Sequence, residues 1–282
     1  MKIACLQTRP MADFTSALAE ALNLAEQAVS SGASFLLLPE YCGGLKGAGA
    51  KLTPPAATEE DHPVLAGLRA FAAKHNVWML IGSIAIAGQA GKIINRGFMI
   101  DDTGAIRSRY DKIHMFDIQL SETEVYEESA TVSAGNQAVL VDTPLGCVGH
   151  SICYDLRFPQ LYRDMAQAGA EILVTPAAFT KKTGQAHWHV LNRARAIENG
   201  AFVIAPCAVG EVPGGGEAYG HSLIIAPWGE VLADGGPEAG IVLADIDITQ
   251  VASARQRIPA LSHDRDYDLA TPSDDTNQRN VA

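Results

Sequence analysis

The stretch FLLLPE, residues 35–40, joins four consecutive apolar residues to a proline and a glutamate. A short apolar run that proline ends predicts a strand buried on both faces, as in parallel sheets. Before it, apolar residues recur at helical spacing over 14–29, with Asp13 as the expected N-cap and Gly32 as the stop. A helix that leads directly into a buried strand is typical of an α/β fold.

The alternation of helices and strands continues through the rest of the chain. The turn at residues 101–104 separates two expected hairpin strands within 92–112, which makes the sheet mixed and not purely parallel. Loops are expected at 43–55 and 210–217, and at 117–138 with about one helical turn. The further expected elements are a helix at 65–72, strands at 77–81, 139–141 and 147–152, a helix from Pro159, a strand at 172–174, a helix at 184–198, a strand at 202–205, and two or three strands within 222–246.

Composition indicates one ordinary globular unit. Hydrophobic residues make up 48% of the 282, and no linker or change of composition divides them. We therefore predict a single domain over 1–270 and a flexible C-terminal tail over 271–282.

Charge and apolar patterning exclude several classes of partner. The formal net charge is −11 and lysines and arginines are not clustered, which argues against nucleic acid and anionic membranes. No run approaches the roughly 18–20 apolar residues of a membrane span. The first ten residues contain too short an apolar run for a signal peptide, and the five cysteines lack regular spacing. These features predict a cytoplasmic protein without disulfides.

Three polar side chains each follow an apolar, strand-like stretch: Glu40, Lys112 and Cys153. A cysteine becomes a strong nucleophile when it loses its proton, so a carboxylate base and an ammonium group are useful neighbours for it. The alternatives are ordinary ones, because lone cysteines are often buried apolar residues and lone lysines are usually solvated. Spacing alone does not show that the three residues meet.

Histidines offer rival sites. His150 lies three positions before Cys153, and His187 and His189 flank Trp188, so a cysteine-histidine pair or a zinc site is conceivable. No CxxC or HExxH pattern supplies further ligands, so no metal is expected. The glycine-rich pieces GGLKGAG (43–49) and GEVPGGGE (210–217) lack the ending of a phosphate-binding loop, so no nucleotide cofactor is expected either.

Three segments resemble the catalytic motifs of the nitrilase superfamily of carbon-nitrogen hydrolases: LLLPE at 36–40, YDKIHMFD at 110–117 and GHSICYDLRFPQLYR at 149–163. The segments AHWHVLNRARAIE and YGHSLIIAPWG look most like the amidase branch, which includes omega-amidases and deaminated glutathione amidases. The resemblance implies a four-layer α-β-β-α sandwich with two mixed sheets, a homodimer, and no metal or organic cofactor.

The resemblance also implies roles for individual residues. Glu40 matches the general base, Lys112 the lysine that stabilises the oxyanion, and Cys153 the nucleophile. Glu128 matches a second glutamate, although the neighbouring Glu127 leaves that alignment open by one position. The backbone N–H of Tyr154 would be the second oxyanion donor. Apart from the resemblance, Arg157 and two residues just past a strand, Ala178 and Phe179, are candidates to face the substrate. The alternatives are a surface salt bridge for Arg157 and strand-end packing for the other two.

The function that follows is an amidase acting on a small linear carboxamide through a cysteine thioester, with release of ammonia and a carboxylic acid. Deaminated glutathione is the preferred substrate and α-ketoglutaramate its close rival. An N-carbamoyl-amine hydrolase is a second enzyme hypothesis. A binding or scaffold protein with this fold is the non-enzymatic one, and the complete set of Glu40, Lys112 and Cys153 argues against it.

Overall fold

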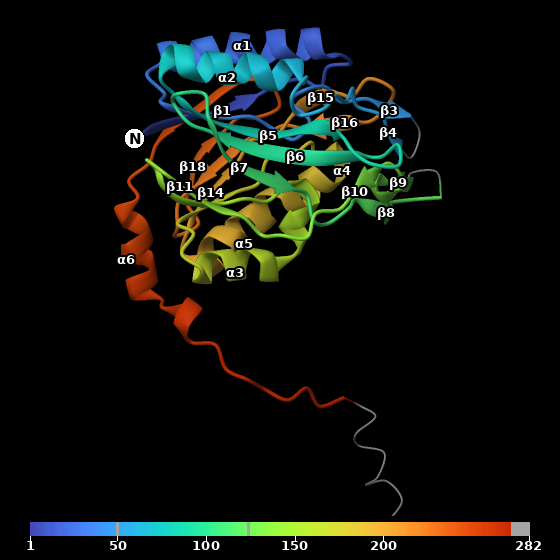
Figure 1. Cartoon of the computed structure of the whole chain (residues 1–282). Coiled ribbons are helices and arrows are strands. Elements are labelled where there is room, and N and C mark those ends of the chain that lie inside the picture. Colours follow the sequence, from blue (N-terminus) through green and yellow to red (C-terminus); the bar gives the residue numbers. More distant parts are fainter. Residues whose placement is uncertain (49–50, 123–124, 272–282) are drawn as a thin grey trace, which may run out of the picture.

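The computed structural model describes residues 1–48, 51–122 and 125–271. Within these, two mixed sheets lie face to face between two layers of helices (Figure 1). This arrangement is the predicted four-layer sandwich. The predicted tail lies outside the described residues apart from Thr271, and a single domain over 1–270 stays a prediction.

Among the described residues the first sheet has seven strands, and its centre pairs β1 (Lys2–Gln7), β2 (Phe35–Leu37) and β5 (Trp78–Ala87) in parallel. Strand β7 (Ile106–Asp111) pairs antiparallel with β6 as the predicted hairpin. The other strands follow in the order β10 (Val132–Ser133), β6 (Ile93–Ile100), β5 (Trp78–Ala87), β2 (Phe35–Leu37), β1 (Lys2–Gln7) and β19 (Gly240–Asp245).

The second sheet has six strands in the described part of the chain and is also mixed, with β12 (Gly146–Gly149), β13 (Ile172–Val174) and β14 (Phe202–Ala205) parallel. Its edges are antiparallel hairpins. The order is β11 (Leu140–Thr143), β12 (Gly146–Gly149), β13 (Ile172–Val174), β14 (Phe202–Ala205), β17 (Leu223–Ile225) and β18 (Val231–Asp234).

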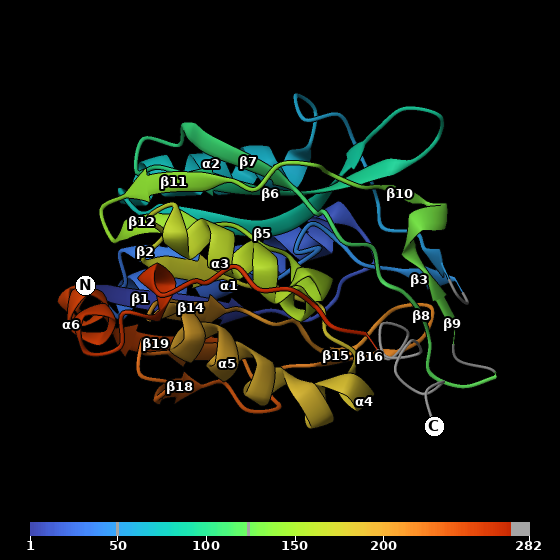
Figure 2. The ribbon, with the colours of Figure 1, turned by 90° about the horizontal axis from the view of Figure 1, so that it is seen from below.

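Helices cover the outer face of each sheet. Helices α1 (Phe14–Ser30) and α2 (Pro63–His75) lie side by side over the first sheet, and α3 (Pro159–Gln167) and α5 (His189–Asn199) cover the second (Figures 1 and 2). Asp13 is the N-cap of α1 as predicted, because its Oδ1 accepts the Ser16 N–H at 2.9 Å. No helix among the described residues has the length and apolar character needed to cross a bilayer.

Alternating side chains of the central strands fill two cores at once. Ile3 and Cys5 of β1 point between the sheets, whereas Ala4 and Leu6 point toward α1 and α2. Both faces of such a strand are buried, which explains the uninterrupted apolar runs in the sequence. A third core lies between the second sheet and helices α3 and α5.

Several expected elements differ in extent. The stretches predicted as loops contain three short hairpins, β3 (Gly47–Ala48) with β4 (Lys51–Leu52), β8 (Asp117–Gln119) with β9 (Val125–Glu127), and β15 (Val209–Glu211) with β16 (Glu217–Tyr219). Helix α6 (Thr249–Arg257) was not predicted, because it is mostly polar and buries only Val251 and Ala254. The helix expected at 184–198 is a short α4 (Lys181–Thr183), a π-helical turn (Gly184–Trp188) and α5.

Strand ends bring the candidate residues together. Glu40 follows β2, Lys112 directly follows β7, and Cys153 follows β12. Strand β12 stops at Gly149, three residues earlier than predicted, so the segment that leads to Cys153 is already outside the sheet.

Candidate active site

Glu40, Lys112 and Glu128 form one buried charged cluster. The Lys112 Nζ donates to Glu40 Oε1 at 2.9 Å and to Glu128 Oε1 and Oε2 at 2.9 and 2.8 Å. The side chains of all three residues are at most 3% exposed. Burial opposes the charge on Lys112, but the carboxylates of Glu128 and Glu40 outweigh it and raise the pKa of Lys112 well above its ordinary value. Lys112 is therefore a fixed ammonium group.

The second glutamate in contact with Lys112 is Glu128. It begins the 3-10 turn Glu128–Ala130, and its Oε2 also accepts the Phe116 N–H at 2.7 Å. Glu127 is exposed. Because both carboxylate oxygens of Glu128 bind the Lys112 Nζ, Glu128 fixes the direction of the ammonium group.

Cys153 sits at a strained bend beside this cluster. Its φ is +50°, in the left-handed region, and its N–H donates to the carbonyl of Pro176 at 2.9 Å. Burial first, and then the Glu40 carboxylate, raise the pKa of its thiol well above the usual value, while the Lys112 ammonium acts the other way. The resting thiol keeps its proton, so attack by sulfur needs a base to remove that proton.

The bend also presents backbone N–H groups. Cys153 begins a 3-10 helix, Cys153–Arg157, and the first N–H groups of a helix lack intrahelical acceptors. Tyr154 is the second residue of this helix, so its N–H is one of these groups. It is therefore available to an oxygen atom placed near Cys153.

Asp155, which sequence reasoning did not select, holds the bend in place. Its Oδ2 accepts the Tyr110 hydroxyl at 2.7 Å and the Ile152 N–H at 2.8 Å. Its Oδ1 accepts the backbone N–H of His114 at 3.0 Å and lies 2.7 Å from the His114 Nδ1. This fully buried carboxylate thus ties the segment after β7 to the segment around Cys153.

Two further contacts orient Glu40. Buried Asn95 donates from Nδ2 to Glu40 Oε1 at 2.9 Å, and the Ala178 N–H donates to Glu40 Oε2 at 2.9 Å. The sequence analysis did not select Asn95 as a site residue, because nothing in the residues around an asparagine inside a strand indicates a role in a site. Ala178 was expected to face substrate, and the structure shows that its backbone positions Glu40.

The pocket above Cys153 has aromatic walls. Phe116, Tyr126, Tyr154 and Phe179 line it together with the four residues Glu40, Lys112, Glu128 and Cys153, and with Ala178, Thr180, Thr183 and Glu217. Arg157 lies beside this wall, with its guanidinium 5.8 Å from the Tyr154 ring centroid and 5.6 Å from that of Phe179. The predicted substrate-facing residues therefore lie in or next to the pocket.

The rival pairing of His150 with Cys153 finds no support. His150 Nε2 lies 3.0 Å from the Ser108 hydroxyl, and burial lowers the pKa of His150 to about 4. His187 lies 3.3 Å from Arg157, whereas His189 belongs to a different cluster.

Comparisons with known proteins identify the family. A family model described as carbon-nitrogen hydrolase matches residues 2–256. A deaminated glutathione amidase of Synechocystis sp. is 39% identical over 264 residues, which cover 92% of this chain and 96% of that protein. Human omega-amidase NIT2 is 34% identical over 264 residues, covering 94% of this chain and 95% of that protein.

Solved structures agree with the sequence matches. The NitFhit protein of C. elegans has a TM-score of 0.85 at 33% identity, covering 94% of this chain and 65% of that longer chain. Nit3 of Saccharomyces cerevisiae, described as a member of branch 10 of the nitrilase superfamily, has a TM-score of 0.80 at 28% identity over 92% of this chain and 94% of that chain. The fold and the matches define a hydrolase of carbon-nitrogen bonds with the nitrilase fold. The chain belongs to the carbon-nitrogen hydrolase family, and its relatives place it among the amidases.

Proposed function

We propose that this amidase hydrolyses the amide of deaminated glutathione through a thioester on Cys153. The observation that carries the proposal is the meeting of Cys153, Glu40 and Lys112 at one pocket, although 72 residues separate the glutamate from the lysine. A buried thiol, a buried carboxylate and a fixed ammonium group can serve as the nucleophile, the base and the oxyanion donor of acyl transfer to sulfur.

In the first half-reaction Glu40 is the base. It takes the thiol proton as the sulfur attacks the amide carbon, so a thiolate never has to persist in the buried site. The Lys112 Nζ and the Tyr154 N–H stabilise the oxyanion that forms. Protonation of Glu40 neutralises one of the two carboxylates that bind the Lys112 ammonium group. The other carboxylate, Glu128, keeps the ammonium group in place. Collapse of the tetrahedral intermediate breaks the C–N bond, and the proton on Glu40 passes to the departing nitrogen.

In the second half-reaction Glu40 takes a proton from water, which attacks the thioester carbonyl. The same two donors stabilise the second oxyanion. Breaking the C–S bond frees the carboxylic acid, and the proton returns to the sulfur of Cys153. One carboxylate thus alternates between base and acid, and the net reaction is amide plus water giving acid plus amine.

Substrate choice rests on the pocket and on the relatives. The aromatic walls and the adjoining Arg157 suit a linear substrate that carries a carboxylate, and Arg157 would supply the opposite charge. A Synechocystis relative of nearly the same length is a deaminated glutathione amidase. α-Ketoglutaramate is the alternative, on the likeness to omega-amidase. The amide nitrogen of deaminated glutathione belongs to cysteinylglycine, so the ammonia release expected from the sequence is corrected for this substrate: only α-ketoglutaramate would release ammonia.

A substrate panel tests the proposal, with α-ketoglutarate measured because both substrates yield it. We expect kcat/KM for deaminated glutathione to exceed that for α-ketoglutaramate by about tenfold or more. The Cys153→Ala variant should keep its fold and lose turnover, whereas Cys147→Ala, which removes a thiol outside the pocket, should not. Higher kcat/KM for α-ketoglutaramate would make the protein an omega-amidase. Carbon dioxide release from an N-carbamoyl amine would move it to another branch, and turnover by Cys153→Ala would refute the thioester.

The proposal extends to a cytoplasmic homodimer. Helix α5 exposes Val190 and Ile197 at 68% and 52%, and Trp228 nearby is 57% exposed. An outer helix with large apolar residues in water is suited to pairing with a second copy. Light scattering of the purified chain measures the mass that decides between monomer and dimer.

A further inference from the structure

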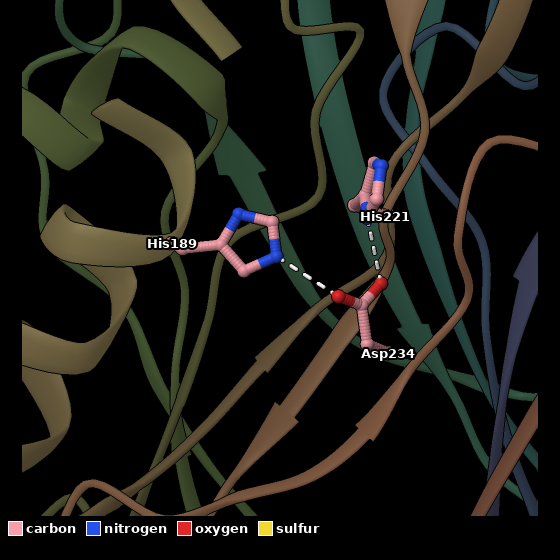
Figure 3. Close-up of side chains that lie close together, drawn as sticks. All are labelled: His189, His221 and Asp234. Carbon is pink, nitrogen blue, oxygen red and sulfur yellow. Dashed lines mark hydrogen bonds and ion pairs between the residues drawn. The ribbon is translucent and has the colours of Figure 1, made fainter. Parts of the chain in front are cut away.

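A second cluster of titratable side chains lies outside the pocket. It joins His189, at the start of α5, to His221, just before β17, and to Asp234, at the end of β18 (Figure 3). The Asp234 Oδ2 lies 2.9 Å from His189 Nε2, and its Oδ1 lies 2.9 Å from His221 Nδ1. Nothing in the proposed reaction uses these three residues.

We propose that His189, His221 and Asp234 bind one divalent transition-metal ion of the Zn²⁺ class. Two imidazoles and one carboxylate are a donor set that suits zinc, cobalt and nickel and does not suit magnesium or calcium. The carboxylate faces the gap between the two rings, and one nitrogen of each ring points at it (Figure 3).

The distances are close to those of a coordinated ion. The ligand atoms all lie within 4.8 Å of one another. Bonds of about 2.1 Å in tetrahedral geometry place ligand atoms about 3.4 Å apart, so the most distant pair must close by up to about 1.4 Å. The side chains of His189, His221 and Asp234 are 34%, 24% and 35% exposed, which gives the rings room to move and leaves a position for water.

The backbone holds His221 ready for this role. Its φ is +53°, in the left-handed region, and its N–H donates to the Gly236 carbonyl at 2.8 Å. Its own carbonyl accepts the Trp188 Nε1–H at 2.8 Å, and the Tyr219 ring stacks on its imidazole at 4.5 Å. Such fixed, strained residues cluster at functional sites.

Asp234 and His189 are also anchored. The Gly236 N–H donates to Asp234 Oδ1 at 2.9 Å, which orients the carboxylate in the way that outer contacts orient metal ligands. His189 directly follows the π-helical turn Gly184–Trp188, and such turns are frequent at functional sites.

An ion here would join α5 to the second sheet near the substrate pocket. Trp188, next to His189, packs on Phe179 with ring centroids 4.9 Å apart, and Phe179 lines the pocket. Metal binding would therefore restrain Phe179 of the pocket wall through its contact with Trp188. The proposal does not depend on which amide the enzyme hydrolyses.

The test uses the full chain stripped with a chelator and then titrated with Zn²⁺ alone. We expect one Zn²⁺ per chain, with a dissociation constant of about 10 µM or tighter, and a rise in Tm on binding. Co²⁺ in its place should give visible bands without a thiolate charge-transfer band, which separates this site from the cysteines.

Variants locate the ion. Asp234→Asn and His189→Gln should each weaken Zn²⁺ binding by about tenfold or more. The His189→Gln variant should fold, because glutamine can still donate to Asp234 and the position is partly exposed. It therefore provides the test if Asp234→Asn fails to fold. His263→Gln removes an exposed histidine elsewhere and should bind as the wild type does. No Zn²⁺ binding by the wild type, or unchanged binding in both cluster variants, would leave only a hydrogen-bonded clamp and overturn the proposal.

Discussion

The carboxylates of Glu40 and Asp234 each hold two side-chain partners within hydrogen-bond distance, but Glu40 is 3% exposed and Asp234 is 35% exposed. Two unit charges 4 Å apart interact by about 1 kcal/mol in water and about 4 kcal/mol at the effective dielectric of a protein. The buried Glu40–Lys112–Glu128 cluster must therefore keep its pairing. In the partly exposed His189–His221–Asp234 cluster, by contrast, each side chain can exchange its partners for water or an ion. Burial, more than the identity of the groups, separates a fixed site from an adaptable one.

Replacing Lys112 by methionine should have the largest effect on the buried cluster. The change leaves two buried carboxylates without their cation, so the unfolding free energy should fall by about 3–5 kcal/mol. Amidase turnover should fall by about 10³-fold or more, because the change removes the proposed oxyanion donor. Urea denaturation and kcat measure the two effects.

Lys74→Met is the matched control at an exposed pair. The Lys74 side chain is 70% exposed and lies 3.7 Å from Glu26, so its loss should change the unfolding free energy by less than about 0.5 kcal/mol. If Lys112→Met and Lys74→Met unfolded at the same urea concentration, the buried ion pair would contribute no more to stability than the exposed one. Burial would then not explain why the Glu40–Lys112–Glu128 cluster is fixed.

Glu128→Gln should have an intermediate effect, confined mainly to turnover. Glutamine keeps the shape, and Lys112 retains Glu40, so the fold should survive. Lys112 loses the carboxylate that directs its ammonium group, so kcat should fall by about 10²-fold. Glu127→Gln changes the exposed neighbour and should leave kcat within about twofold of the wild type. Equal kcat losses in both variants would show that position 128 has no special role.

The layers of the fold could be predicted from the sequence, because strands buried on both faces leave unbroken apolar runs. FLLLPE marks β2, and the helical spacing after Asp13 marks α1. Polar α6 and the short hairpins left no such signal, because they bury few apolar side chains.

The site was predictable only in part. Glu40, Lys112 and Cys153 follow strands, but the four-layer arrangement and the role of Glu128 came from resemblance to a family. Asn95 and Asp155 were missed because their partners lie 55 and 45 positions away, and periodicity reports only local neighbours.

The His189–His221–Asp234 cluster was missed for the same reason. His189 drew attention beside His187, yet its partner Asp234 lies 45 positions further along the chain. No short motif connects residues at that spacing.

Asp234→Asn should have the smallest effect, provided a chelator keeps metal away. Partial burial raises the pKa of Asp234, but hydrogen bonds from His189, Gly236 and His221 outweigh burial and hold that pKa below its ordinary value. A lowered folded-state pKa means that the carboxylate stabilises the fold above its unfolded-state pKa, and that this contribution is lost as pH falls through the folded-state value. With solvent screening, we expect a loss of about 0.5–1 kcal/mol at pH 7.

Urea denaturation of Asp234→Asn at pH 7 and at successively lower pH measures this loss. The difference in unfolding free energy from the wild type should shrink at the lowest pH, where Asp234 is protonated in both the folded and the unfolded protein. Asp102→Asn, at an exposed turn position, should show no difference at either end. A loss of several kcal/mol at pH 7 would mean that the fold depends on the partners of Asp234 as strongly as on those of Glu40, and the contrast between the two clusters would fail.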